Sequence, residues 1–416
     1  MRIIADLHIH SRYSRGCSRG LILESIAKWC DRKGIGLVGT GDFTHPAWFS
    51  DIKDLLVEDK KGIYKLKDSA TKARFILSTE ISCIYSQGGK TRRLHIIILA
   101  PSVETVEKII ADFTKRGYNL KSDGRPIIGC SAKELTRIVL EIDRRCMIIP
   151  AHAWTPWFAV FGSKSGFDSL AECFEELTPQ IYAIETGLSS DPLMNWRLSP
   201  LDKITLVSNS DAHSLANLGR EANVLEIDQD KLSYDEIYRI IKEKDKKKFL
   251  YTIEFFPEEG KYHIDGHAAC GFSCLPEASK KNDNLCPKCG RPLILGVLNR
   301  VSELADRAGV SELDNIPYKH LIPLQEIIAA VLDVGKGSKK VIRIYDEMTK
   351  KNTEFEILLD LSEKEMATIA DAEIASAIIN MRAGQVDIEP GYDGIYGKVS
   401  IKKQADKTIK KQEKLF

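Results

Sequence analysis

Short apolar runs alternate with longer amphipathic stretches over roughly residues 1–230. The short runs have the length of buried strands, and they are Arg2–Leu7, Leu37–Thr40, Arg74–Ser78, His95–Ala100, Met147–Pro150, Ala183–Glu185 and Thr205–Ser208. The longer stretches have helical spacing, and they are Leu21–Lys33, Val103–Lys115, Ala132–Asp143 and Ser169–Leu177. This alternation predicts parallel strands joined by crossover helices. Seven strands in about 210 residues favour a (β/α) barrel, whose active site lies at the C-terminal ends of its strands.

The pattern changes further along the chain. A charged helix is expected over Asp235–Lys247 and a strand over Phe249–Phe255, but the polar segment from Glu258 to Arg291 has little periodicity. Helical spacing then returns, in Val297–Ala308, Leu321–Leu332 and Ser362–Ile379. The glycine-rich segment Glu389–Lys398 is expected to be a turn-rich loop. We therefore predict three domains, at residues 1–257, 258–295 and 296–416, the last of them mainly helical.

The charge balance and the N-terminus narrow the class of protein. A formal net charge of +1 over 416 residues gives no global basic field, and the lysine runs Lys242–Lys248 and Lys402–Lys414 are most simply solvated faces or tails. No apolar run reaches the length of a membrane helix, and MRIIADLHIH has the pattern of a strand and not of a signal peptide. We expect a cytoplasmic protein that is not associated with a membrane.

Side chains that bind metals recur at the ends of the predicted strands. His8 and His10 are two residues apart in an extended segment and so point to the same face. The other candidates are Asp42, Glu80, His95, His152, Asp211 and His213, with His45 as either a ligand or a neighbour of the ligands. A single strand-end histidine is more often a structural hydrogen bonder, but the strand ends of a barrel converge in space.

Mixed imidazole and carboxylate ligands suit Zn, Mn or Fe better than Ca or Mg. A carboxylate such as Glu80 or Asp211 can bridge two ions, which lower the pKa of water and neutralise charge on phosphate oxygens. The chain has no P-loop and no Ser/His/Asp nucleophile signature. The pattern therefore predicts a metal-dependent phosphoesterase.

Two closely spaced cysteine pairs lie in the polar segment. Cys270 and Cys274 precede Cys286 and Cys289 by eleven intervening residues, a spacing typical of a structural zinc site with four cysteine ligands. His263 and His267 lie nearby, but four cysteines already complete a tetrahedral shell. Basic residues surround this predicted zinc finger, namely Lys280, Lys281, Lys288 and Arg291. A nucleic-acid contact and a simple folding role are both open.

The ligand motifs resemble those of the polymerase and histidinol phosphatase (PHP) family. The resemblance rests on His8-Ile-His10, Glu80, His95, Pro150-Ala-His152 and Ser210-Asp211-Ala-His213. It implies a distorted (β/α)7 barrel with two or three divalent metal ions (Zn, Mn, Fe or Mg). It also implies a set of ligands: His8, His10, Glu80, His95, His152, Asp211 and His213.

Two departures from the PHP pattern matter. Gly16 stands where that family usually has a His or Asp, and Thr40-Gly41-Asp42 stands where it usually has Thr-Asp-His. Asp42 would then replace a histidine ligand, and one metal position would be weaker or only transiently filled.

The whole chain resembles the endonuclease Q family of DNA-repair nucleases. The resemblance rests on the order of barrel, cysteine finger and helical domain, and on the segments at 39–45 and 390–397. It implies a nucleoid-associated DNA endonuclease that acts in double- or single-stranded DNA, on the 5′ side of a deaminated base (hypoxanthine, uracil or xanthine) or an abasic site. The resemblance also suggests a sliding clamp as a partner. The tail Lys410–Phe416 loosely resembles a clamp-binding peptide, but many charged tails do.

An enzyme that inspects a base in a duplex must flip it into a pocket. Aromatic residues near the strand ends are candidates for its walls, although such residues more often pack in a core: Tyr13, Trp48, Trp154 and Trp157. Arg12, Arg15 and Arg19 follow the first strand and are candidates for a phosphate clamp.

Two other functions compete with a DNA-repair endonuclease. One is a small-molecule phosphatase of the histidinol-phosphate type, which would not need the zinc finger. The other is a DNA-binding module with a decayed metal site, against which the nearly complete ligand set argues.

Overall fold

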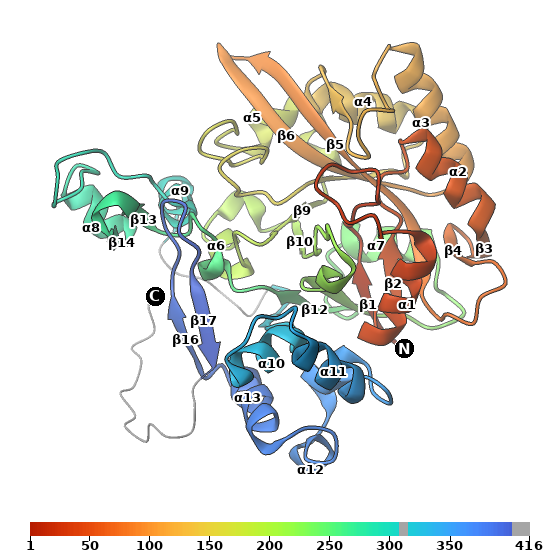
Figure 1. Cartoon of the computed structure of the whole chain (residues 1–416). Helices are drawn as coiled ribbons and strands as arrows, with labels where there is room; N and C mark the ends of the chain where they lie inside the picture. The colour runs from red at the N-terminus through yellow and green to blue at the C-terminus, as the bar shows by residue number, and fades with distance from the viewer. Residues whose placement is uncertain (308–314, 402–416) are drawn as a thin grey trace. The chain divides into compact units, whose positions relative to one another are not determined.

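The computed structural model describes residues 1–307 and 315–401 of the 416-residue chain. These residues form two compact units (Figure 1). The first contains Met1–Asp31 and Ile35–Glu254, and the main part of the second begins at Phe255. Among the described residues, no helix combines the length and the apolar character that crossing a bilayer requires. The lysine run at 402–414 and the clamp-like tail at 410–416 lie outside the described residues.

A mixed sheet forms the framework of the first unit. Its central strand β1 (Arg2–Asp6) runs parallel to β2 (Leu37–Gly39), which runs parallel to β5 (Arg74–Gln87). On its other side β1 pairs in antiparallel fashion with β11 (Ala222–Glu226), and β11 with β12 (Phe249–Glu254). The remaining strands along this path are β3 (Leu56–Lys60), β4 (Ile63–Leu66) and β15 (Tyr318–His320).

A long hairpin departs from the expected parallel arrangement. β5 and β6 (Lys90–Ala100) pair in antiparallel fashion from Leu77↔Ala100 to Gln87↔Lys90, and Gly88 and Gly89 turn the chain with positive φ. β8 (Met147–Pro150) is antiparallel to β6. The prediction that all strands run parallel is therefore wrong at β6, because two glycines replace the crossover helix between β5 and β6. β8 is antiparallel to β6 and so runs in the same direction as β5, as predicted.

Two short strand pairings complete the first unit. β7 (Ile127–Ile128) is parallel to β5, and β9 (Ala183–Glu185) forms a separate parallel pair with β10 (Thr205–Val207). Together with the main sheet, these pairings bring the ends of strands that are distant in sequence to one region of this unit.

Helices follow most of these strands, and several begin at a serine that caps the helix. In α3 (Val103–Lys115) and α4 (Ala132–Ile142), the side chains of Ser102 and Ser131 accept hydrogen bonds from the N–H groups of Thr105 and Glu134. The other helices of this unit are α1 (Leu23–Lys33), α2 (Pro46–Leu55), α5 (Leu170–Phe174), α6 (Pro192–Asn195) and α7 (Tyr234–Lys242).

The core of the first unit lies on the sheet. Leu37, Ile76, Ile97 and Ile149 come from four different strands and belong to one buried apolar cluster. Burial of such side chains is the main favourable term in folding, and here it fixes the strand ends that carry the candidate ligands.

The second unit combines helices with two small hairpins. Its helices are α8 (Pro276–Lys281), α9 (Val297–Leu304), α10 (Leu324–Leu332), α11 (Lys339–Met348), α12 (Glu363–Met366) and α13 (Ala372–Arg382). One hairpin pairs β13 (Asp265–His267) with β14 (Phe272–Cys274), and the other pairs β16 (Val386–Glu389) with β17 (Lys398–Ile401). The second hairpin encloses the segment that was expected to be a loop.

A buried carboxylate organises the cysteine-rich segment. Asp265 is fully buried and accepts hydrogen bonds from the N–H of Gly296 (2.7 Å), the amide of Asn299 (2.6 Å) and the hydroxyl of Ser279. These bonds tie β13, α8 and α9 together where few apolar side chains are available.

Replacing this carboxylate tests its structural role. Asp265→Ala leaves three buried donors without their acceptor, so we expect the free energy of unfolding to fall by about 3 kcal/mol in urea titrations. Glu277→Ala, in the exposed first turn of α8, serves as the control. A change below about 0.5 kcal/mol for Asp265→Ala would show that the network is not a structural support.

Candidate metal centre

Three candidate ligands gather directly beyond β1. The ligand atoms of His8, His10 and Asp211 all lie within 4.8 Å of one another. His10 Nε2 is 3.0 Å from Asp211 Oδ1, and His8 Nε2 is 3.8 Å from the same oxygen. His8 Nε2 is buried, and the structure gives it no hydrogen-bond partner. This nitrogen is therefore available to a cation.

Three more candidate ligands gather at β5, β6 and the end of β8. Glu80 Oε1 lies 2.8 Å from His95 Nδ1 and 3.3 Å from His152 Nε2, and the two histidine nitrogens are 3.1 Å apart. All three side chains are buried or nearly so. The antiparallel β5–β6 hairpin, which the sequence did not reveal, brings Glu80 beside His95.

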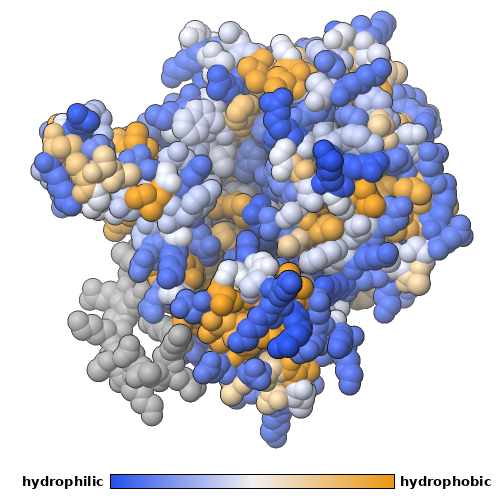
Figure 2. All heavy atoms as spheres, viewed as in Figure 1, coloured by the Kyte–Doolittle hydropathy of each residue, from blue (hydrophilic) through white to orange (hydrophobic). Residues whose placement is uncertain are grey.

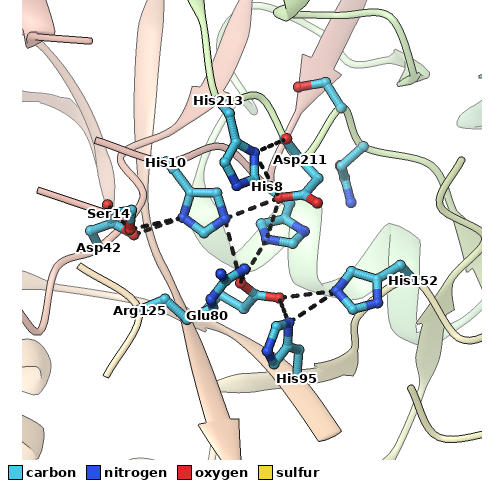
Figure 3. A network of polar contacts seen from close by, with 12 residues as sticks. His8, His10, Ser14, Asp42, Glu80, His95, Arg125, His152, Asp211 and His213 are labelled. Atoms are coloured by element: carbon cyan, nitrogen blue, oxygen red, sulfur yellow. Dashed lines mark hydrogen bonds and ion pairs between the residues drawn. The ribbon is translucent and has the colours of Figure 1, made fainter. Parts of the chain in front are cut away.

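Glu80 stands between the two groups (Figure 3). While Oε1 faces His95 and His152, Oε2 lies 3.4 Å from His10 Nε2 and 3.7 Å from His8 Nε2. Burial alone would raise the pKa of Glu80, but His95, Arg125 and His8 outweigh burial and hold the pKa well below its ordinary value. The carboxylate is thus ionised and has one oxygen for each group.

The spacing of these atoms fits divalent cations. Two N or O ligands bound at about 2.0–2.2 Å to one tetrahedral ion lie about 3.4 Å apart. The separations of Asp211 from His8 and His10, and of Glu80, His95 and His152 from one another, run from 2.8 to 3.8 Å, around this value. Because His8 Nε2 also has no hydrogen-bond partner, this spacing makes both groups suitable for Zn, Mn or Fe.

Asp42 lies behind His10. Its Oδ1 is 3.0 Å from His10 Nδ1, and its Oδ2 accepts hydrogen bonds from the N–H (2.7 Å) and hydroxyl (2.7 Å) of Ser11 and from the hydroxyl of Ser14 (2.8 Å). Both oxygens are occupied, so the geometry favours orientation of the His10 ring over direct metal ligation.

Glu185 orients the His8 ring as Asp42 orients the His10 ring. It was not among the candidates predicted from the sequence. Glu185 Oε1 lies 3.0 Å from His8 Nδ1 and accepts a hydrogen bond from Asn209 Nδ2 (2.9 Å), while Oε2 accepts the N–H of His152 (2.8 Å). Glu185 could have been predicted from its place at the end of β9, since most of the other candidates also lie at strand ends.

These carboxylates control the protonation of the two rings. Burial lowers the pKa of both His8 and His10, but Glu185 and Glu80 beside His8, and Asp42 beside His10, outweigh burial and raise each pKa well above its ordinary value.

Strained backbone marks three of the candidates. Asp42, His152 and Asp211 have φ values of 46°, 30° and 46°, a region that residues other than glycine rarely adopt. Buried Asp6 supports the Asp211 turn by accepting hydrogen bonds from the N–H of Ser210 (3.0 Å) and of Gly219 (2.9 Å). Such strain persists only where surrounding contacts enforce it, and it is common at functional sites.

The remaining histidine candidates lie at the margin of the two groups. His213 is one-third exposed, with Nδ1 3.7 Å from Asp211 Oδ1, and its ring centroid is 4.7 Å from that of His10. His45 stacks on Tyr13 at 4.3 Å, and its buried Nδ1 makes no hydrogen bond. Neither belongs to the two groups of converging ligand atoms.

Arg125 lies at the same site without having been anticipated. Its Nη1 donates to Glu80 Oε2 at 3.0 Å, and 22% of its side chain is exposed. It comes from an irregular segment before β7, where no sequence pattern marks a site residue. It supplies a permanent positive charge beside the candidate ligands.

The aromatic candidates differ in exposure. Trp48 is fully buried and donates to Thr40 O and Gly41 O, and Trp154 is buried and donates to Asn195 Oδ1. The Trp48 indole therefore supports the segment that leads to Asp42, and the Trp154 indole ties the segment after His152 to α6. Tyr13 is half-buried, whereas Trp157 is 43% exposed, so these two rings are accessible.

The three arginine candidates lie in the loop after β1. Arg12 is paired with Asp51 at 3.2 Å and lies over the Tyr13 ring. Arg15 and Arg19 are exposed. None of them contacts the two ligand groups through a hydrogen bond or ion pair in the described residues.

Solved structures resemble this chain over nearly its full length. The lesion-specific endonuclease PfuEndoQ from Pyrococcus furiosus superposes with a TM-score of 0.85 and 31% identity, over 96% of each chain. Endonuclease Q in complex with a 27-mer duplex substrate with an abasic lesion superposes with a TM-score of 0.83 and 32% identity, over 97% of each chain. This chain belongs to the endonuclease Q family.

Sequence relatives match this endonuclease Q family member over different lengths. Residues 323–385 match the MJ0043 C-terminal domain. Protein MJ0043 of Methanocaldococcus jannaschii is 35% identical over 256 residues, which are 61% of this chain and 32% of MJ0043, so the match spans about a third of that relative. YqxK of Bacillus subtilis is 27% identical over 412 residues, covering 96% of this chain and 99% of YqxK.

The cysteine-rich segment of this endonuclease Q family member brings together a different set from the four cysteines expected. The ligand atoms of His267, Cys270, Cys286 and Cys289 lie within 4.8 Å of one another. His267 Nδ1 is 3.6 Å from Cys289 Sγ, which is about the separation of N and S ligands on tetrahedral zinc. Burial would raise the pKa of the Cys286 thiol, but the N–H groups of Lys288 and Cys289 outweigh it and lower the pKa. Cys274 is not in this group.

Zinc content distinguishes the two possible ligand sets. We expect His267→Ala to lose most of the structural zinc, because the imidazole is within reach of the three thiols, and Cys274→Ser to retain about one zinc per chain. Mass spectrometry of purified proteins after removal of active-site metals measures this content. The reverse result would restore the four-cysteine site.

Proposed function

We propose that this chain is a DNA-repair endonuclease that hydrolyses the phosphodiester on the 5′ side of a deaminated base (hypoxanthine, uracil or xanthine) or an abasic site. Membership of the endonuclease Q family supports a nuclease, since PfuEndoQ is a lesion-specific endonuclease and endonuclease Q binds a duplex with an abasic lesion. The proposal extends the reaction and the substrate class to this chain.

One observation carries the proposal, namely the shared carboxylate of Glu80. It has one oxygen toward His8 and His10 and the other toward His95 and His152. Two groups joined by one carboxylate suit two divalent ions. Such ions would draw charge from phosphate oxygens and from the departing oxygen, and would favour ionisation of water.

The protein's own groups prepare the site for this reaction. Asp42 and Glu185 fix the His10 and His8 rings through Nδ1, which leaves both Nε2 atoms directed at the site. Arg125 lies 3.0 Å from Glu80. If a bound cation neutralised Glu80, the Arg125 guanidinium would be suited to contact a phosphate oxygen. These groups would bind and orient the phosphodiester.

The base would be read after it leaves the duplex stack. Of the aromatic candidates, the accessible Tyr13 and Trp157 are the ones we retain for a base pocket. The exposed Arg15 and Arg19 would contact the DNA backbone. We further propose that the first unit is a distorted (β/α)7 barrel and that the zinc finger contributes to DNA binding.

Cleavage of a defined duplex tests the proposal. The labelled strand carries one deoxyinosine, and the metal-loaded protein is expected to make a single nick on its 5′ side. A small-molecule phosphatase is not favoured, because the family likeness includes the second unit. Hydrolysis of histidinol phosphate with an intact duplex would support it nevertheless, and tight binding without a nick would support a DNA-binding module.

Removing the shared carboxylate charge should abolish turnover. We expect Glu80→Gln to lower kcat at least about 10³-fold, because metal ions supply several kcal/mol of transition-state stabilisation, while binding of the lesion duplex changes only a few-fold. Glu104→Gln, at an exposed position of α3, is the matched control. Glu80→Gln with wild-type kcat would refute the assignment.

Metal affinity should depend on pH. Because the pKa values of His8 and His10 are raised, these rings keep protons at neutral pH until a cation displaces them. Affinity for Mn²⁺ should therefore rise as the pH increases from about 6 to about 8. Calorimetry in buffers of different ionisation enthalpy should detect proton release. An affinity that is constant or falls over this range would contradict the proposed ligands.

A further inference from the structure

The loop between β16 and β17 is held firmly within the second unit. The N–H groups of Gly391, Gly394 and Gly397 donate to the carbonyl oxygens of Glu258 (2.8 Å), Lys261 (2.9 Å) and Glu259 (3.1 Å). The carboxylate of Asp393 accepts a hydrogen bond from the N–H of Ala268 (2.6 Å). The tip of the hairpin is thereby fixed against the segment that leads into the cysteine cluster.

Glycine is required at two points of this loop. A Cβ on Gly391 would collide with the backbone oxygen of Gly260, and a Cβ on Gly397 with that of Glu258. The close backbone approach therefore depends on the absence of side chains. The arrangement gives the loop one conformation before any partner binds.

This fixed loop presents two large side chains to solvent. Tyr396 is 72% exposed and Ile395 is 43% exposed. Tyr392, by contrast, packs against Gly266 and anchors the loop. An aromatic ring held out on a rigid turn loses little conformational entropy when it binds, and neighbouring exposed apolar residues commonly mark an interaction site.

The surroundings of Tyr396 favour nucleic acid as the partner. Lys261 Nζ lies 5.8 Å from the centroid of the Tyr396 ring, and Lys398 is exposed two residues further along. Figure 2 shows apolar atoms among hydrophilic ones on the segment that Figure 1 labels α8, β13 and β14. The exposed apolar residues there include Leu275 and Ile294. Ring stacking beside ammonium groups is how proteins hold bases without reading their sequence.

We propose that Tyr396, with Ile395 beside it, inserts into the base stack of duplex DNA as a wedge. Apolar and aromatic side chains that enter a base step unstack it and kink the duplex, which lowers the cost of extruding a nucleotide. This inference rests on the proposed function, because it concerns the same DNA substrate. It assigns the segment at 390–397 a role in opening the duplex.

Equilibrium binding and base unstacking test the wedge. The probe is a lesion duplex with 2-aminopurine beside the lesion, whose fluorescence rises when its neighbour unstacks. Tyr396→Ala should weaken binding about 5- to 150-fold, the range that corresponds to 1–3 kcal/mol of stacking per base, and should remove most of the fluorescence rise. Tyr396→Phe keeps the ring and should behave like the wild type. Val334→Ala removes another exposed apolar side chain of the second unit and is the control.

The outcomes separate this inference from the proposed function. If the wild type nicks the lesion duplex and Tyr396→Ala matches it within twofold in affinity and in fluorescence, the wedge is refuted while the nuclease stands. If the wild type neither binds nor nicks the duplex, both proposals fail. Unchanged melting temperature and zinc content of Tyr396→Ala would attribute its defect to the lost ring.

Discussion

The site depends on one buried carboxylate that two groups of histidines share. An ionised side chain in the protein interior is costly unless opposite charge surrounds it. Glu80 is 1% exposed, and Arg125 and four histidine nitrogens lie within 3.7 Å of its oxygens. The same charge balance that allows the carboxylate to stay ionised makes the position suitable for two cations. The sheet positions these groups. Glu80 lies on β5 and His95 on β6, while His8, His10 and His152 follow the ends of β1 and β8.

A surrounding set of acids fixes the geometry of these ligands. Asp42 and Glu185 each hold the far nitrogen of a histidine ring, and Asp6 holds the turn before Asp211. Each acid is itself buried and hydrogen-bonded by backbone or hydroxyl groups. This support explains how Asp42, His152 and Asp211 persist in a strained backbone conformation. The free-energy cost of this preorganised site is thus offset by contacts of residues that lie behind the candidate ligands.

The strands and candidate ligands could be predicted from the sequence where a metal-binding residue type stands at the end of an apolar run. The bounds of β8 and β9 and the gathering of His8, Glu80, His152 and Asp211 follow from pattern and residue type. Arg125 could not be predicted, because its loop has no periodicity and only the tertiary fold carries it to Glu80. The same holds for His267 against Cys274, where sequence spacing favours the cysteine but the tertiary fold brings the ligand atoms of His267, Cys270, Cys286 and Cys289 together. The strand His95–Ala100 was predicted, but its antiparallel direction and its start at Lys90 were missed, because polar residues interrupt the apolar pattern near Gly88 and Gly89.

The proposed site holds two cations on either side of one carboxylate, and anomalous scattering would measure their positions directly. Crystals loaded with Mn²⁺ and measured near the manganese edge should show two strong peaks about 3.5–4 Å apart, one beside each oxygen of Glu80. One peak would lie near His8 and His10 and the other near His95 and His152. A single peak distant from Glu80, or no peak in crystals that bind Mn²⁺ elsewhere, would contradict the shared two-cation site.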